Sequence, residues 1–459
     1  MKQIYLKYKP HYKDNLALAI PVMISQVGQT LVQMADTIIV GHFAGTVSLA
    51  AVSLSSNLFS IFMITGIGIS YGLTPLIAQN NGRKDYAECG ALLSNSLLIN
   101  IITGILLFSI VLFCSVFLLN NLHQTPEVIA QARPFFILLG VSVIPMMLFV
   151  TFKQFAEGLG FTKQAMVISI LGNVLNVVLG IIFVKGLFGI SPMGVRGVGY
   201  STLITRCVMA IVMSSYVLRS EKFKKYLTSF IVTNIEKSRV FQILKKGLLI
   251  AMQYVFEISA FAMASVMSGW IGVHEQAAHA AAINLAATTY MMASGLGAAA
   301  AIKSGYYFGG SDYHKLRHSA ISSYHIVLVF MGTTALTFAI FNQYLPWIYT
   351  SDKAVIAIAS QLLIIAAFFQ LFDGTQVVGL GILRGMGDVN IPTLITFISY
   401  WVIGLPFGYI VGIRLHWGVN GVWYGLVLAL MSASVMLFIR FHFISKKIKD
   451  KAALVAVEG

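Results

Sequence analysis

Twelve long apolar segments dominate the chain, and their length limits the folds open to it. They lie near residues 15–41, 49–77, 90–118, 128–150, 163–185, 194–218, 242–270, 275–302, 316–341, 355–381, 391–412 and 418–443. A helix needs about 20 apolar residues to cross the hydrocarbon core of a bilayer. The segments are continuous, unlike the short alternating strands of a membrane barrel. The sequence therefore predicts an all-α polytopic membrane protein with twelve transmembrane helices.

The charge of the chain agrees with a membrane protein better than with a nucleic-acid-binding one. Hydrophobic residues make up 58% of the sequence and charged residues 10%, whereas a soluble protein carries about 25% charged residues. Of the 31 Lys and Arg residues, 24 fall on the side that holds both termini, and four fall in the opposite loops. The positive-inside rule then predicts that both termini are cytoplasmic, and we expect no nucleic-acid partner.

The second half of the chain repeats the first at an offset of 227 residues. Segment 45–68 resembles segment 272–297, and segment 194–200 resembles segment 418–424 after a slip of three residues. Each half holds six predicted spans, so both halves enter the membrane in the same direction. This is a parallel repeat, as found in some secondary transporters.

The repeat predicts two pseudo-symmetric six-helix bundles, formed by residues 1–218 and 242–459. The basic segment 219–241 is expected to join them as a cytoplasmic linker, with a partly amphipathic helix on the membrane surface.

Motifs for soluble enzyme chemistry are not found in the sequence. There is no phosphate-binding GxxxxGK[ST], no HExxH and no CxxC pair, and the three cysteines are widely spaced. We therefore expect no cofactor, no enzymatic activity and a transport process driven by an ion gradient. Two other classes stay open at this point: an enzyme that uses paired carboxylates within the membrane, and a channel or receptor.

Three carboxylates lie inside the apolar segments, where a charge is costly. Asp36, Glu257 and Asp373 are the three, and the other 13 acidic residues fall in loops, termini or segment ends. A charge at the bilayer centre costs about 2.5–3.5 kcal/mol on insertion scales, so such residues indicate a functional site. Na⁺ or a proton would neutralise the buried charge and so couple ion binding to conformation.

Polar side chains accompany these acids at helical spacing. Gln33 precedes Asp36 by three residues, Gln253 precedes Glu257 by four, and a further stripe lies in the fifth span. Asn284 is either an interhelical hydrogen bonder or part of the cavity. The candidate cavity residues are Gln33, Asn173, Asn176, Gln253, Asn284, Gln370 and Gln376.

Four motifs in order resemble the MATE (multidrug and toxic compound extrusion) transporters of the NorM-like branch. They are IPVMISQVGQTLVQMADTIIVGHFAG with PLIAQNNGRKDY, QYVFE at 253–257, and FDGTQVVGLGILRGMGD at 372–388. The resemblance covers essentially the whole chain. It implies a V-shaped antiporter that exports cationic or amphipathic small molecules in exchange for Na⁺ or H⁺. We also expect a monomer that lies in the bacterial inner membrane.

The resemblance also implies roles for individual residues. Glu257 and Asp373 match the two acids of the cation site in the C-terminal half, and they are the Na⁺ ligands that the resemblance implies. Asp36 matches the first-span acid and Asn176 a fifth-span polar residue, while Gly180 stands where relatives often carry Asn or Asp. The presence of both Glu257 and Asp373 favours Na⁺ over H⁺.

The closest rival is a flippase for a lipid-linked precursor, because related folds carry such cargo. It predicts a row of cavity cations for phosphate groups. The spans offer only Arg206, Arg133 and Lys303 for this purpose.

Overall fold

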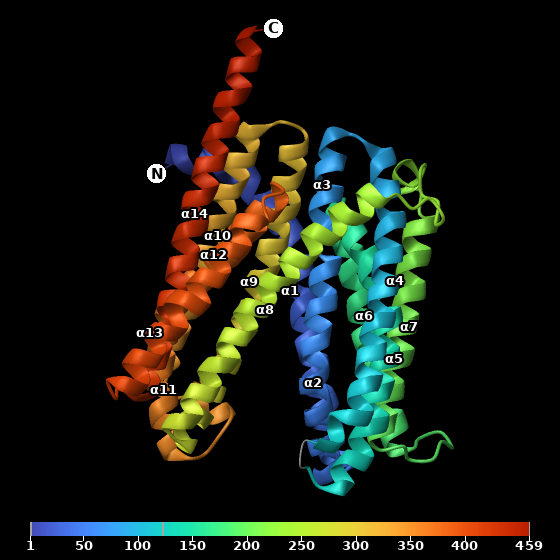
Figure 1. Cartoon of the computed structure of the whole chain (residues 1–459), viewed down its shortest axis with the longest axis vertical. Coiled ribbons are helices and arrows are strands. Elements are labelled where there is room, and N and C mark those ends of the chain that lie inside the picture. Colours follow the sequence, from blue (N-terminus) through green and yellow to red (C-terminus); the bar gives the residue numbers. More distant parts are fainter. Residues whose placement is uncertain (1, 122–123, 459) are drawn as a thin grey trace. The chain divides into compact units, whose positions relative to one another are not determined.

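The computed structural model describes residues 2–121 and 124–458, and these form helices with no β-strand (Figure 1). Within those residues, twelve helical stretches are long and apolar enough to cross a membrane, which confirms the predicted number of spans. The helices are α1 (Lys2–Phe43), α2 (Thr46–Ser70), α3 (Leu73–Arg83), α4 (Tyr86–Phe117), α5 (Pro126–Gly158), α6 (Thr162–Lys185), α7 (Val195–Arg219), α8 (Lys237–Ile271), α9 (Val273–Gly309), α10 (Tyr313–Phe341), α11 (Lys353–Gly385), α12 (Asn390–Phe397), α13 (Leu405–Tyr409) and α14 (Gly418–Glu458). Short 3-10 turns are η1 (Leu119–Asn121), η2 (Lys224–Tyr226) and η3 (Leu345–Ile348), and π-helical turns are η4 (Ile398–Gly404) and η5 (Ile410–Arg414).

Helix boundaries repeat at the offset predicted from the sequence. The starts of α2, α4 and α5 are each followed 227 residues later by the starts of α9, α10 and α11. α5 and α11 are both 33 residues long. Each is the central helix of its half, since α5 packs on α2, α4 and α7, and α11 packs on α9, α10 and α14. The sequence repeat is therefore also a repeat of helix order and packing.

The chain divides into two compact units whose borders fall inside helices. Unit 1 contains the residues up to Met23 and those from Met252 onward, and unit 2 contains Ile24–Ala251. Helix α1 therefore begins in unit 1 and ends in unit 2, whereas α8 begins in unit 2 and ends in unit 1. The bundles predicted from the repeat, with borders at 218 and 242, stay a prediction.

Glycines at equivalent positions of the repeat contact the start of α1, which lies in unit 1, and the start of α8, which lies in unit 2. A Cβ atom on Gly68 of α2 would lie 2.5 Å from the Cα atom of Ala251, at the part of α8 that belongs to unit 2. A Cβ atom on Gly295 of α9 would lie 2.6 Å from the backbone nitrogen of Met23, in the part of α1 that belongs to unit 1. Small residues let helix backbones approach this closely, as is common in membrane proteins.

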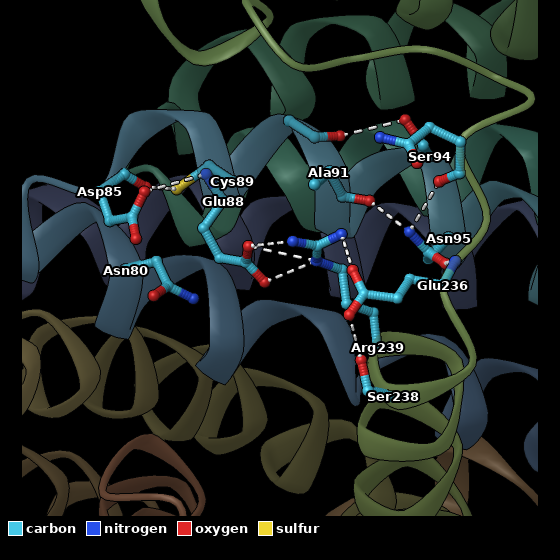
Figure 2. A network of polar contacts seen from close by, with 12 residues as sticks. Asn80, Asp85, Glu88, Cys89, Ala91, Ser94, Asn95, Glu236, Ser238 and Arg239 are labelled. Atoms are coloured by element: carbon cyan, nitrogen blue, oxygen red, sulfur yellow. Dashed lines mark hydrogen bonds and ion pairs between the residues drawn. The ribbon is translucent and has the colours of Figure 1, made fainter.

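The segment that joins α7 to α8 is docked on unit 2. Its residues 220–236 form turns and the short η2, so the surface helix expected here is limited to the end of the segment, where α8 begins. Asn95 of α4 donates to the backbone oxygen of Asn234. It also accepts from the backbone nitrogen of Glu236, and both residues are labelled in Figure 2. Arg239 forms a bidentate ion pair with Glu88, with N–O distances of 2.9–3.1 Å.

The eleventh span is one continuous helix that changes between α-helical and π-helical turns. The sequence predicts one helix over 391–412, and the structure has a single helical span over Asn390–Arg414, in which α12, η4, α13 and η5 follow one another without a gap. Pro406 lies at the start of α13 and cannot donate a backbone hydrogen bond to the preceding turn, which loosens the helix there. The wider turn η4 carries Tyr400, which is fully buried.

Candidate functional site

Two of the three predicted acids come together inside unit 1. Glu257 lies on α8 and Asp373 on α11, and the two residues are only 4% and 2% exposed. Their carboxylates are close enough to interact electrostatically. Two like charges in a buried place repel, so the pair favours a cation or proton that reduces this repulsion.

Two tyrosines that no sequence motif indicates complete the surroundings of Glu257. The hydroxyls of Tyr290 from α9 and Tyr400 from η4 lie within hydrogen-bonding range of its carboxylate. The Tyr400 hydroxyl donates to Gln376 Oε1 at 2.9 Å. The chain has 19 tyrosines, and only the packing of α9 and the position of η4 distinguish these two.

The predicted glutamines of α11 are buried and take part in hydrogen bonds. Gln370 Nε2 donates to the Thr289 hydroxyl of α9 at 2.7 Å. Gln376 lies three residues after Asp373 and therefore on the same helix face. Its Nε2 is buried and has no hydrogen-bond partner among the described residues. An unpaired buried donor of this kind marks a place where water or a ligand can be accepted.

Gln253 links three segments of unit 1 through its hydrogen bonds. Its Nε2 donates to the Thr393 hydroxyl at 2.8 Å and to the backbone oxygen of Val389 at 3.3 Å. Its Oε1 accepts from Arg384 Nε at 2.9 Å and from Nη2 at 2.6 Å. The side chain that was predicted to line a cavity thus joins α8 to α11 and α12.

Arg384 is a site residue that the sequence places only among the cytoplasmic charges. It stands in the last turn of α11, and its guanidinium also lies 5.0 Å from the ring centroid of Tyr254, whose hydroxyl accepts from Nη1 at 3.3 Å. The guanidinium interacts electrostatically with Glu257, one turn further along α8. Asn284 of α9 is exposed, and its predicted role stays a prediction.

The third acid, Asp36, lies in unit 2 beside a different cation. Arg206 of α7 interacts electrostatically with its carboxylate, donates to the Ser142 hydroxyl at 2.8 Å and stacks over the Phe59 ring at 5.4 Å. Asp36 Oδ1 is buried and accepts no hydrogen bond from the described residues. Arg206 therefore compensates the charge of an acid within the bundle.

The polar stripe of the fifth span faces α1 and α7. Asn176 is buried and donates to the Thr202 hydroxyl at 3.3 Å, while Asn173 packs against Gly28 of α1. Asn176 Oδ1 and Asn173 Nδ2 are buried without hydrogen-bond partners in the described chain. Gln33 is exposed on α1. Unit 2 thus holds a second polar region, separate in the fold from the carboxylate pair.

A transition-metal site is not formed by the part of the chain that the structure describes. No three His, Cys, Asp or Glu side chains are grouped there as metal ligands. Hard cations take oxygen ligands, and the site of unit 1 supplies two carboxylates and two tyrosine hydroxyls. This donor set is compatible with Na⁺, and Na⁺ binding by Glu257 and Asp373 stays a prediction.

Comparison with known proteins places the chain in a family. The family model MatE matches residues 21–182 and 250–410. The chain is 33% identical over 446 residues to "Multidrug resistance protein MdtK" of Photorhabdus laumondii, covering 96% of this chain and 97% of that protein. It is 32% identical over 442 residues to "Multidrug resistance protein NorM" of Photobacterium profundum, covering 95% and 96%.

Solved structures show the same fold. The structure described as "Crystal structure of MATE in the bent conformation" matches with a TM-score of 0.89 at 21% identity, over 99% of each chain. That of the eukaryotic MATE transporter AtDTX14 matches with a TM-score of 0.86 at 16% identity, over 97% of this chain and 99% of the other. The family model, the full-length relatives and the twelve membrane-spanning helices together establish that this multi-pass membrane protein belongs to the MATE family.

Proposed function

We propose that the protein is a multidrug efflux antiporter that exports cationic or amphipathic compounds in exchange for Na⁺, with H⁺ as the other candidate ion. The observation that carries the proposal is the meeting of Glu257 and Asp373 in one buried cluster of unit 1. Relatives that share about a third of its residues over nearly their full length bear the name multidrug resistance protein, which supports the same function.

The chemistry proposed for the site is reversible neutralisation of buried charge. A cation between the two carboxylates removes their repulsion, and its release restores the repulsion. A ligand changes the balance between two conformations only by its differential affinity for them. The geometry around Glu257 and Asp373 must therefore differ between the state that binds the cation and the state that releases it, and alternating access supplies that difference. No covalent step is needed, and the cargo leaves unchanged.

We further propose that the protein works as a monomer in a bacterial inner membrane, with both termini in the cytoplasm. The support is the excess of Lys and Arg in the loops on that side. Of the cations considered for a lipid-phosphate cavity, Arg206 compensates Asp36 and Lys303 pairs with Asp14 at 3.1 Å. These pairings leave the flippase alternative with less support than the antiporter.

Reconstitution into liposomes tests the proposal. Efflux of a fluorescent cationic dye should follow an imposed Na⁺ gradient, measured separately from an imposed H⁺ gradient. Glu257→Gln and Asp373→Asn should each abolish the coupled component while the protein still inserts. Asp352→Asn, which neutralises an exposed acid of the same unit just before α11, serves as the matched control. Full coupled efflux by both carboxylate variants would overturn the assignment, and movement of labelled lipid without dye efflux would favour the flippase.

A further inference from the structure

We infer that Arg384 is a fixed counter-charge of the cation site, which leaves the Glu257–Asp373 pair able to take one monovalent cation. The inference rests on the cation coupling proposed above. It adds the number of ions bound and the residue that sets this number.

The guanidinium is held in place by groups that are themselves buried or anchored. Two of its nitrogens donate to Gln253 Oε1, at 2.6 and 2.9 Å, and a third donates to the Tyr254 hydroxyl at 3.3 Å. Gln253 is fully buried and is fixed from its other end by Thr393. A planar guanidinium with three such contacts has a defined position, which a flexible ammonium group would lack.

The position of this charge is close to Glu257 without direct pairing. Gln253 and Glu257 are four residues apart on α8, so their side chains are neighbours on one face. In the described part of the chain, no carboxylate lies within ion-pair distance of Arg384, in contrast to Arg440 of the same unit, which pairs with Asp388 at 2.9 Å. The electrostatic partner of Arg384 is therefore the site itself.

The charges of the cluster then sum to a single negative charge. When both carboxylates are ionised they contribute two negative charges, and Arg384 contributes one positive charge. A single Na⁺ brings the cluster to neutrality, and a second would give it an excess positive charge in a buried place. Removal of Arg384 leaves two negative charges and should make cation binding tighter. For a unit charge beyond ion-pair distance in an effective dielectric constant of about 20, the change in affinity is roughly tenfold.

The repeat shows that this counter-charge belongs to one half only. At the offset of 227 residues, Arg384 corresponds to Glu157 of α5. Glu157 is itself paired with Lys153 on the same helix at 3.8 Å, and both are buried. The arginine is thus not a requirement of the shared fold, because the equivalent place in the first half carries the opposite charge.

Sodium-dependent thermal unfolding of the purified protein in detergent measures the predicted effect without transport. NaCl is varied against choline chloride at constant ionic strength, because a ligand stabilises the folded state as it fills its site. We expect Arg384→Gln to lower the half-saturating Na⁺ concentration by about tenfold and to raise the Hill coefficient from about 1 toward 2. For Arg384→Lys the half-saturating Na⁺ concentration should stay within about threefold of the wild-type value. Arg440→Gln should have the wild-type value.

A second variant separates the charge from its position. Gln253→Leu removes the acceptor that holds the guanidinium, so Arg384 can approach Glu257 and compete with Na⁺. The half-saturating concentration should then rise, opposite to the effect of Arg384→Gln. The double variant Gln253→Leu/Arg384→Gln should return to the behaviour of Arg384→Gln. If Gln253 and Arg384 only held the helices together, both single variants would shift the half-saturating Na⁺ concentration in the same direction.

The outcomes distinguish this inference from the function on which it rests. If Glu257→Gln loses the Na⁺ response while Arg384→Gln keeps the wild-type half-saturation and Hill coefficient, the counter-charge is wrong and the cation site stands. If the wild type shows no Na⁺ response at all, Na⁺ coupling is wrong and the inference falls with it. Poor recovery of Arg384→Gln leaves the test to Gln253→Leu, where an unchanged or lowered half-saturation contradicts the inference.

Discussion

Units 1 and 2 share a helix order and differ in how they balance buried charge. In unit 2 the one span acid of the candidate set, Asp36, has Arg206 beside it, so one negative charge meets one positive charge. In unit 1 the two carboxylates of Glu257 and Asp373 meet only Arg384, which is held a helical turn away by Gln253. The first arrangement is neutral by itself, and the second becomes neutral when a monovalent cation binds.

The difference explains why three equally unusual acids need not have equal roles. A buried carboxylate that is matched by an internal cation has little to gain from a further ion. A pair of carboxylates with one uncompensated negative charge is stabilised when a monovalent cation binds and neutralises that charge. The cation-dependent step is therefore expected in unit 1, and Asp36 is left for a part in cargo binding or in the packing of unit 2.

The largest expected effect compares the acids of the two units directly. Glu257→Gln should remove the stabilisation of the protein by Na⁺. Asp36→Asn should keep it, with a half-saturating Na⁺ concentration within about threefold of the wild type, because the charge of Asp36 is compensated by Arg206. The measurement is the Na⁺ dependence of the unfolding temperature in detergent. Loss of the response in Asp36→Asn would break the comparison, since unit 2 would then also hold part of the cation site.

The opposite charges of Asp36 and Arg206 in unit 2 predict a large cost when only one of them is removed. Arg206→Gln leaves Asp36 with a buried oxygen and no cation, and should destabilise the protein by about 2–3 kcal/mol. The double variant Asp36→Asn/Arg206→Gln should recover much of this loss. Thermal unfolding of the two single variants and the double variant gives the coupling energy, and additive losses would show that the two charges do not compensate each other.

The contacts that fix the start of α1 in unit 1 and the start of α8 in unit 2 should differ in how much they stabilise the protein. In unit 1, Asn15 of α1 is buried and donates at 2.9 Å both to the Ser319 backbone oxygen and to the Ser323 hydroxyl. Asn15→Ala should cost about 2 kcal/mol, because buried partners lose their hydrogen bonds. In unit 2, Arg239→Ala breaks the partly exposed pair with Glu88 and should cost about 1 kcal/mol. Equal costs in thermal unfolding would contradict this ranking.

The smallest effect concerns a helix cap that both units share. Asp312 caps α10 by accepting from the backbone nitrogen of Lys315 at 3.0 Å, as its repeat equivalent Asp85 caps α4 by accepting from Glu88 at 3.1 Å. Asp312→Ala should cost about 1 kcal/mol, like other lost caps.

The same cap predicts a pH dependence with a definite sign. Burial opposes ionisation of Asp312, but hydrogen bonds from the side chain and backbone of Lys315 outweigh it and hold the pKa of Asp312 below its ordinary value. A lowered pKa stabilises the folded state above the ordinary value of about 3.9, and this contribution is lost as the pH falls through the lowered one. The difference in unfolding temperature between wild type and Asp312→Ala should therefore shrink on acidification, and a growing difference would contradict it.

The sequence by itself determined the membrane class, the number of spans, the repeat and the unusual acids. Twelve apolar stretches of sufficient length can only be helices in lipid, and a carboxylate inside one is conspicuous because its burial is costly. Helical spacing also placed Gln376 on the face of Asp373. These are local properties, set by residues within a few turns of one another, so they can be read without knowing which helices are neighbours.

The tertiary structure alone decided which charges meet. It placed Glu257 near Asp373 and Arg206 near Asp36, and it brought Tyr290, Tyr400 and Arg384 to the site, although no sequence pattern indicated a role there. It also placed the two ends of α1 in different units, and likewise the two ends of α8. Residues 220–236 became a segment that packs on α4 of unit 2. Such contacts depend on the packing and register of helices that are distant in the chain, and helical periodicity gives the face of a residue but not the partner across from it.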